Sequence, residues 1–147
     1  MSKDELREEV LQRRRDMDVA VRLVAADAIA LHLRAAPVLA SARRVACYVS
    51  MATEPGTGPL IEGLMSRGIE VIVPLSLADG TLDWVAYDPA ASSSMPPLGI
   101  SEPEGEPLGA AGLDDCALII VPALAVDHTG NRLGRGAGYY DRALAGT

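Results

Sequence analysis

The chain has 147 residues, 49% of them hydrophobic, and a formal charge of −7. This length favours one domain with a buried core, and the hydrophobic content excludes a disordered chain. The negative charge argues against a general nucleic-acid binder. The charged N-terminus is not a signal peptide, and no apolar run is long enough to span a membrane. We therefore expect a cytoplasmic protein without nucleic-acid or membrane partners.

Two helices are predicted at the start of the chain. Ser2 and Glu5 fit a capping box for the first helix, in which leucine and valine then recur at helical spacing. We expect the run 13–15, which is three arginines, on a solvated face of this helix. A second helix is predicted over residues 19–36, where alanine, leucine and valine dominate and a proline follows.

A β-α-β unit is predicted next. Residues 44–50 are apolar and β-branched, as in a buried strand, and residues 69–74 have the same character. Between them a helix capped by Thr57 should run to Arg67 and stop at Gly68. A helical connection of this length predicts that the two strands are parallel and share one sheet.

Two more strands are predicted further along the chain. Residues 82–87 should form an edge strand, for which an antiparallel orientation is open, and Trp84 within it should be a packing residue. The long connection 88–112 is rich in proline, glycine and serine, and is a candidate ligand-binding loop. Residues 117–122 are predicted to form a buried strand. These elements predict an α/β fold of three layers, with a mainly parallel open sheet flanked by helices.

The turn after the first strand is a candidate ligand site, because open α/β sheets bind ligands at the carboxyl ends of their strands. Glu54 lies in this turn and could hold a polar ligand that bears an amine; the alternative is a solvated loop acid. Lys3 and Arg7 are four residues apart and emerge from one helix face. By themselves they are best explained as surface cations paired with neighbouring acids.

The glycine-rich stretch is the strongest functional signal. It follows the strand 117–122 and precedes a helix that starts near Tyr139, and its glycines are Gly134, Gly136 and Gly138. Backbone N–H groups in such a loop can turn toward phosphate oxygens. The spacing matches neither G-x-G-x-x-G nor a Walker A loop. A flexible turn is therefore an equal alternative on spacing alone.

Charged residues in the same stretch favour the phosphate interpretation. Arg132 and Arg135 could donate charge-assisted hydrogen bonds to phosphate oxygens. Asp141 lies one turn further on and could hold a divalent cation beside them. Their alternative role is that of solvated surface charges.

Four blocks of the sequence stand out when they are taken together. The blocks are Lys3-x-x-Leu6-Arg7, Tyr48-Val49-Ser50-Met51 with Glu54, Gly99-Ile100-Ser101-Glu102-Pro103, and Val121 through Arg142. In this order they resemble the 5-formyltetrahydrofolate cyclo-ligase family, also called methenyltetrahydrofolate synthetases. A set of four is far more specific than any one of them.

The resemblance implies a fold related to the NagB, RpiA and CoA-transferase proteins and an ATP-dependent ligase activity. The family converts 5-formyltetrahydrofolate to 5,10-methenyltetrahydrofolate, with ATP as co-substrate and Mg²⁺ as cofactor, and releases ADP and phosphate. It implies that ATP phosphorylates the formyl oxygen, that N10 closes the ring and that phosphate then leaves. Alignment of the γ-phosphate with that oxygen and neutralisation of the developing charge would be the main tasks of the protein.

The resemblance also implies a role for each matching residue. Lys3, the only lysine beside twelve arginines, gains weight as a catalytic residue together with Arg135. Asp141 would hold Mg²⁺. The ATP-binding set is Lys3, Arg7, Arg132, Leu133, Gly134, Arg135, Gly136, Ala137, Gly138, Tyr139 and Tyr140, and the folate-binding set is Val49, Glu54, Leu98, Arg135, Gly136, Gly138 and Tyr139.

The sequence departs from the family pattern in two places. Leu98 stands where the family usually has an aromatic residue that flanks the pterin ring. Family members usually continue for several dozen residues, with further strands and another Mg²⁺-binding aspartate. We therefore expect residues 1–147 to be a single cyclo-ligase domain truncated at its C-terminus, and a monomer or weak homodimer. Two other functions stay open: a non-catalytic nucleotide- or folate-binding remnant, and an ATP-using enzyme with a different small substrate.

Overall fold

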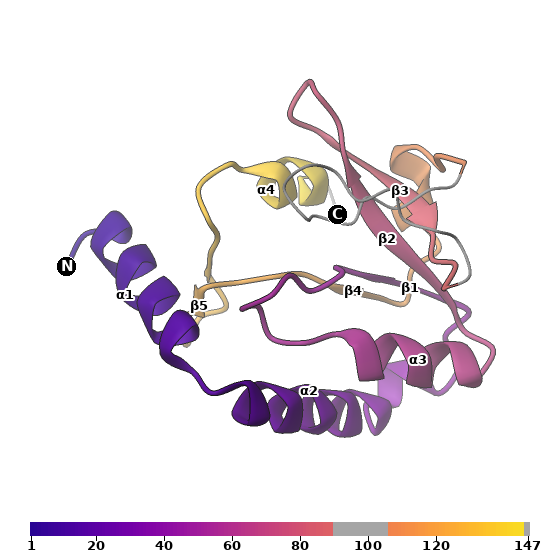
Figure 1. Cartoon of the computed structure of the whole chain (residues 1–147). Coiled ribbons are helices and arrows are strands. Elements are labelled where there is room, and N and C mark those ends of the chain that lie inside the picture. Colours follow the sequence, from indigo (N-terminus) through magenta and orange to yellow (C-terminus); the bar gives the residue numbers. More distant parts are fainter. Residues whose placement is uncertain (90–105, 146–147) are drawn as a thin grey trace.

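A four-stranded sheet lies at the centre of the computed structural model, which describes residues 1–89 and 106–145 (Figure 1). Across the sheet, the strands are β3 (Leu82–Ala86), β2 (Glu70–Ser76), β1 (Arg44–Cys47) and β4 (Leu118–Ile120). β1 pairs in parallel with β2 and β4, and β3 pairs antiparallel to β2 at one edge. The mainly parallel α/β sheet and the edge strand are thus confirmed.

The helices lie close to their predicted bounds. The capping box is present, since the Ser2 hydroxyl accepts the Glu5 N–H at 3.1 Å and the Glu5 carboxylate accepts the Ser2 N–H at 2.8 Å. Gly68, with φ of 78°, follows the helix between β1 and β2. The helices are α1 (Lys3–Asp16), α2 (Val19–Arg34), α3 (Gly58–Ser66) and α4 (Tyr139–Leu144), with 3₁₀ turns η1 (Pro37–Leu39) and η2 (Ala110–Leu113).

The sheet buries apolar side chains on both faces, in the alternation that the strand period requires. Val45 and Cys47 of β1 pack toward α2 and α3, whereas Ala46 packs on the opposite face with Trp84. α2 and α3 cover the first face, and η2 and α4 lie against the second (Figure 1). Trp84 is 1% exposed, which confirms its predicted packing role. The three layers are confirmed as well.

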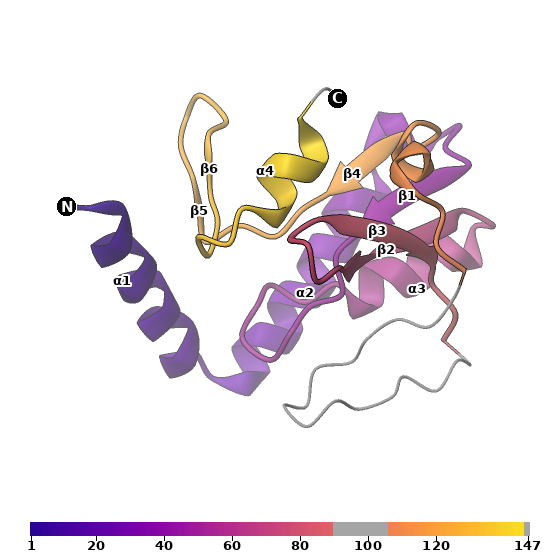
Figure 2. The same ribbon diagram turned by 90° about the horizontal axis from the view of Figure 1, so that it is seen from above.

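A hairpin that was not predicted interrupts the stretch 127–142. β5 (Ala125–Val126) and β6 (Arg132–Leu133) pair antiparallel, and the Asp127 carboxylate accepts hydrogen bonds from residues 129 and 131 across the turn. The glycine-rich loop is therefore confined to the residues after β6. Figure 2 shows the hairpin beside α4, on the side of the molecule where α1 lies.

Two local predictions were wrong. The Thr57 side chain does not cap α3, because its hydroxyl donates to the Tyr48 carbonyl at 2.9 Å instead. The run 13–15 is not wholly solvated, because Arg14 is only 9% exposed and donates to the Ala123 carbonyl. In both cases the side chain donates a hydrogen bond to a backbone carbonyl outside its own helix, whereas the local sequence had predicted a helix cap or a solvated face.

In the described part of the chain, no helix combines the length and the apolar character that a membrane crossing requires.

Candidate active site

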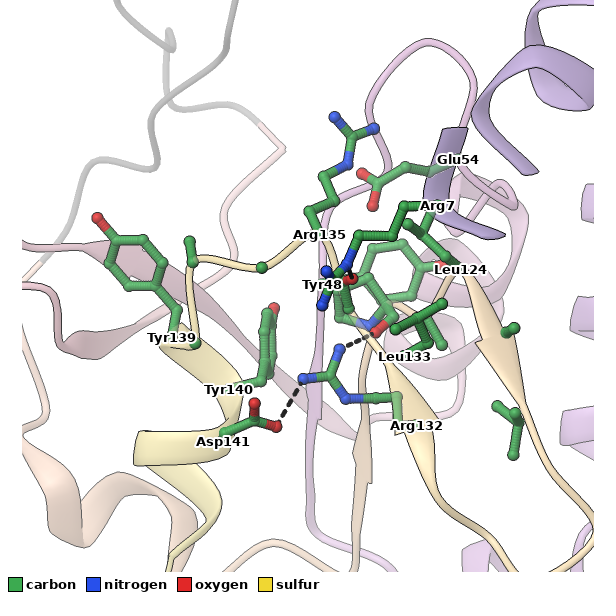
Figure 3. Close-up of a pocket in the computed structure, with 18 of the residues that line it drawn as sticks. Arg7, Tyr48, Glu54, Leu124, Arg132, Leu133, Arg135, Tyr139, Tyr140 and Asp141 are labelled. Atoms are coloured by element: carbon green, nitrogen blue, oxygen red, sulfur yellow. Dashed lines mark hydrogen bonds and ion pairs between the residues drawn. The ribbon is translucent and has the colours of Figure 1, made fainter. Parts of the chain in front are cut away.

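A cleft of about 1590 Å³ opens at the carboxyl ends of the parallel strands (Figure 3). Its walls come from the segments that follow β1 and β4, from the end of β2, from the glycine-rich loop and from the start of α1. The predicted site residues that line it are Lys3, Arg7, Val49, Glu54, Asp141 and the run 132–140. Leu98 and the block 99–103 lie outside the described residues.

Two residues of the glycine-rich loop have backbone angles that favour glycine. Gly136 has φ of 111° and Gly138 has φ of 76°, both in the region that favours glycine. Gly134 has no such requirement in its backbone angles, but a Cβ there would lie 2.9 Å from the guanidinium of Arg132. Gly138 is also the residue immediately before α4, a helix of six residues.

Arg7 ties α1 to this loop. Its Nε donates to the Gly134 carbonyl at 2.8 Å, and its Nη1 pairs with Asp4 at 2.8 Å. The side chain is 23% exposed. Arg7 therefore makes the ion pair with a neighbouring acid that is expected of a surface cation, and it also donates to the glycine-rich loop.

Arg132 holds the other side of the loop (Figure 3). Its Nη1 donates to the Pro122 carbonyl at 2.8 Å, and its Nη2 pairs with Asp141 at 3.1 Å. Its guanidinium carbon lies 5.6 Å from the ring centroid of Tyr140. This side chain therefore joins the end of β4 to β6 and α4. The contact of Arg132 with phosphate stays a prediction. Such a contact would be made in addition to these internal bonds or in place of them.

Lys3 and Arg135 differ from these arginines. Both are exposed, both line the cleft, and neither makes a hydrogen bond or ion pair with any residue in the described ranges. In Figure 3 the Arg135 side chain extends away from Asp141, on the side of the cleft where Glu54 lies. These two cations are thus the ones available to an anionic ligand.

The turn after β1 is held by its own polar groups. Thr57 Oγ1 accepts the Ser50 N–H at 3.0 Å, and Ser50 Oγ accepts the Thr57 N–H at 3.1 Å. One Glu54 oxygen accepts the Met51 N–H at 2.9 Å. The Tyr48 hydroxyl donates to the Pro55 carbonyl at 2.6 Å. The turn therefore presents a fixed carboxylate to the cleft.

Apolar side chains lie next to this carboxylate. Val49 is 40% exposed and Met51 is 41% exposed, and both line the cleft. Burial, with a smaller effect of the Glu54 charge, raises the pKa of Tyr48 to about 12. The same causes raise the pKa of Tyr140. Both phenols are therefore neutral at physiological pH, so this wall combines one carboxylate with apolar and aromatic surface.

Metal binding has limited support from the protein alone. Within the described ranges, no group of three or more Asp, Glu, His and Cys side chains is placed to hold a metal ion. Asp141 has one oxygen on Arg132 and its side chain is 77% exposed. A single carboxylate fits a Mg²⁺ ion that takes its remaining ligands from water and substrate phosphates.

Three arginines contact parts of the site in a way that the sequence analysis did not predict. Arg14 and Arg22 lie inside helices, and Arg22 donates to the Ala52 carbonyl of the Glu54 turn at 3.2 Å. Arg142 contacts the glycine-rich loop through the Ala137 carbonyl at 2.9 Å. A single arginine in the apolar run 19–24 was the available signal for Arg22. No local pattern identifies a carbonyl partner far along the chain.

Comparison with known proteins places these features in one family. The model of the 5-formyltetrahydrofolate cyclo-ligase family matches residues 1–147. The 5-formyltetrahydrofolate cyclo-ligase of Mycolicibacterium smegmatis is 38% identical over 148 residues, which cover 97% of this chain and 75% of the relative.

Solved structures agree with this fold. The NMR structure of Aquifex aeolicus 5,10-methenyltetrahydrofolate synthetase superposes with a TM-score of 0.79 at 31% identity, covering 99% of this chain and 73% of that one. The Mycoplasma pneumoniae 5,10-methenyltetrahydrofolate synthetase supports the fold alone, with a TM-score of 0.76 at 20% identity and coverage of 100% and 79%. The chain belongs to the 5-formyltetrahydrofolate cyclo-ligase family.

Proposed function

We propose that this chain converts 5-formyltetrahydrofolate to 5,10-methenyltetrahydrofolate at the expense of ATP, with release of ADP and phosphate. The observation that carries the proposal is the cleft. It brings Lys3, the Glu54 turn and the glycine-rich loop together from distant parts of a chain whose whole length matches the family.

The chemistry explains why such a cleft is suitable. The formyl oxygen attacks the γ-phosphorus and the bond to ADP breaks, which converts an amide oxygen into a phosphate leaving group. N10 then attacks the formyl carbon and loses its proton, and the C–O bond breaks to release phosphate that retains the formyl oxygen. The protein has to align the two substrates and to neutralise charge on the transferring phosphoryl group.

Lys3 and Arg135 are the residues that we assign to this neutralisation. Their charges are free of protein partners in the described chain, and they lie on different walls of the cleft. Cations held in a partly desolvated site stabilise developing negative charge more than they would in water. The glycine-rich loop would add backbone N–H groups, and Arg7 and Arg132 would support that loop through their carbonyl contacts.

The Glu54 turn is the proposed folate wall. The Glu54 oxygen that does not hold Met51 can accept N–H groups of a pterin-like ring, and the exposed side chains of Val49 and Met51 offer apolar surface beside it. A mixed surface of this kind suits a flat heteroaromatic ring with polar edges. Leu98 stays part of the predicted folate set.

Mg²⁺ belongs to the same proposal. Asp141 is the cleft carboxylate that would hold it, and the ion would supply charge neutralisation on the phosphate oxygens. The remaining expectations are a cytoplasmic location, a single domain, and a monomer or weak homodimer. Light scattering after size-exclusion chromatography would measure the last of these.

One assay tests the function directly. The 147-residue chain is mixed with 5-formyltetrahydrofolate, ATP and Mg²⁺, and absorbance is followed in the methenyl-folate band. We expect a rise that requires both substrates and the metal. Binding of ATP or folate without any rise would favour a non-catalytic binding protein. ATP turnover only with a non-folate compound would favour a different enzyme.

A further inference from the structure

The contact that joins α4 to the turn between β2 and β3 involves one side chain, Arg142. Its Nε and Nη2 both donate to the Gly80 carbonyl, at 2.9 and 2.6 Å, and Nη2 also donates to the Ala137 carbonyl at 2.9 Å. Its guanidinium carbon lies 5.5 Å from the ring centroid of Tyr139. One planar group thus links two loops that are far apart in sequence.

The backbone around Arg142 is shaped to leave it room. A Cβ at Gly138 would lie 2.9 Å from Nη1, and a Cβ at Gly80 would lie 3.2 Å from Nη2. Both glycines also have positive φ, 76° and 86°. Asp79 stabilises the turn that carries Gly80, because its carboxylate accepts the Thr81 N–H at 3.0 Å. Arg142 therefore binds a preformed partner.

The contact between Arg142 and the Ala137 carbonyl also orients the next N–H group of the glycine-rich loop. A trans peptide directs its C=O and N–H in opposite directions. By holding the Ala137 carbonyl, Arg142 therefore directs the N–H of Gly138 away from itself, and that N–H has no protein acceptor in the described chain. α4 has six residues and no side-chain cap, so it is too short to fix this geometry without outside contacts.

We propose that Arg142 is a positioning residue that sets the glycine-rich loop for ATP by clamping Ala137 to the β2–β3 turn. The proposal rests on the proposed function, because it takes ATP as the ligand of this loop. Arg142 acts on the nucleotide only through the backbone that it holds. Lysine cannot replace it, since a single ammonium group lacks the planar arrangement of donors that serves both carbonyls.

The test compares Arg142→Ala and Arg142→Lys with Arg67→Ala. Arg67 is a matched control, because it also donates to two backbone carbonyls, those of Arg34 and Leu39 at 3.3 and 3.4 Å. Neither of these partners lines the cleft, whereas Ala137, which Arg142 holds, does. We expect Arg142→Ala to raise the KM for ATP about tenfold or more, with a change in kcat below about threefold. Arg67→Ala should leave both values unchanged.

Two readouts separate positioning from general loss of structure. Trp84, the only tryptophan, lies edge-to-face against Tyr140 of α4, with the two ring centroids 6.5 Å apart. Quenching of its fluorescence by acrylamide therefore reports whether α4 stays docked, and this measurement needs no ligand. Quenching should increase in Arg142→Ala. Guanidinium chloride at about 20 mM should lower its KM for ATP, whereas equal NaCl should not, because only guanidinium supplies the lost planar donor.

Unchanged KM and quenching in Arg142→Ala would overturn the proposal. So would a loss shared by kcat, both KM values and far-ultraviolet circular dichroism, without rescue by guanidinium. If the wild-type chain forms no methenyl product, the proposed function fails separately. Calorimetric ATP binding then replaces the KM in the same comparison, and absence of ATP binding by the wild-type chain would overturn the inference too.

Discussion

At the scale of single residues, the cations that line the cleft, together with Arg142, which contacts the glycine-rich loop, divide into two groups. Arg7, Arg132 and Arg142 donate to backbone carbonyls, whereas Lys3 and Arg135 have no protein partner among the described residues. A residue that already has partners stabilises the walls, and one without partners is free to bind substrate. The consequence can be measured by removing one free cation.

We expect Arg135→Ala to abolish cyclo-ligase turnover, with kcat reduced by about 10²-fold or more, because it removes the cation that we propose for the transferring phosphoryl group. The fold should remain, since Arg135 is exposed and holds no other described residue. Stopped assays for kcat and thermal unfolding for stability measure the two quantities. Arg13→Ala, which removes an exposed α1 arginine paired with Glu9, is the control. A normal rate in Arg135→Ala would contradict the role of this residue.

A second prediction at this scale concerns the contact between the Glu54 turn and α2. A Cβ at Gly56 would lie 2.7 Å from the Cβ of Ala26, which is 6% exposed. We expect Gly56→Ala to lower the free energy of unfolding by about 1–3 kcal/mol, because overpacking displaces the turn. Urea unfolding measures this loss, and the KM for folate should rise with it.

A double-mutant cycle identifies the clash as the cause. In the Ala26→Gly background, Gly56→Ala should cost less than in the wild type, because the opposing methyl group is gone. Gly58→Ala is the matched control, since a Cβ there meets nothing within 4 Å. Equal costs in both backgrounds would show that the turn tolerates the methyl group by another route.

At the scale of elements, the β5–β6 hairpin depends on one carboxylate. Hydrogen bonds from Asn131, and then from Thr129, lower the pKa of Asp127 from 3.8 to about 2. A lowered pKa in the folded state means that the turn is stabilised above the unfolded value of 3.8 and loses this support as the pH falls toward 2. We therefore expect the turn to persist to lower pH than an ordinary aspartate would allow.

Carbon-13 NMR titration of the Asp127 carboxyl carbon measures this effect. The native midpoint should lie near 2, and the urea-unfolded chain should titrate near 3.8. Asn131→Ala should raise the native midpoint, because it removes the side-chain donor at 2.9 Å. A native midpoint equal to the unfolded one would mean that these hydrogen bonds do not persist in solution.

The same hairpin illustrates what sequence reasoning could and could not provide. The strands 44–50, 69–74 and 82–87 were predictable because burial imposes apolar residues along them, and the capping box was predictable because it is local. β5 and β6 have two residues each, too few for a periodic pattern. Arg14 and Thr57 were misassigned because their carbonyl partners are set by the tertiary fold.

At the scale of the whole molecule, the cleft is built from parts of unequal stability. α3 buries Leu60, Ile61 and Leu64 against the sheet, whereas the only buried residue of α1 is Arg14. α1 projects from the body in Figure 1, and Arg7 and Arg14 hold it to carbonyls of residues 134 and 123. The helix that carries Lys3 is thus among the less strongly anchored parts of the site.

Ligand binding should therefore change α1 more than the sheet. We expect amide hydrogens of α1 to exchange faster than those of α3 in the free protein, because few apolar contacts oppose local opening. Saturating ATP should slow exchange in α1, since Lys3 would gain a phosphate partner and opening would break it. Hydrogen-exchange mass spectrometry with and without ATP measures both effects.

Lys3→Ala should retain the fast exchange and lose the protection by ATP. Protection of α1 equal to that of α3 without ligand would contradict weak anchoring, and an unchanged rate with bound ATP would contradict the placement of Lys3 at the nucleotide.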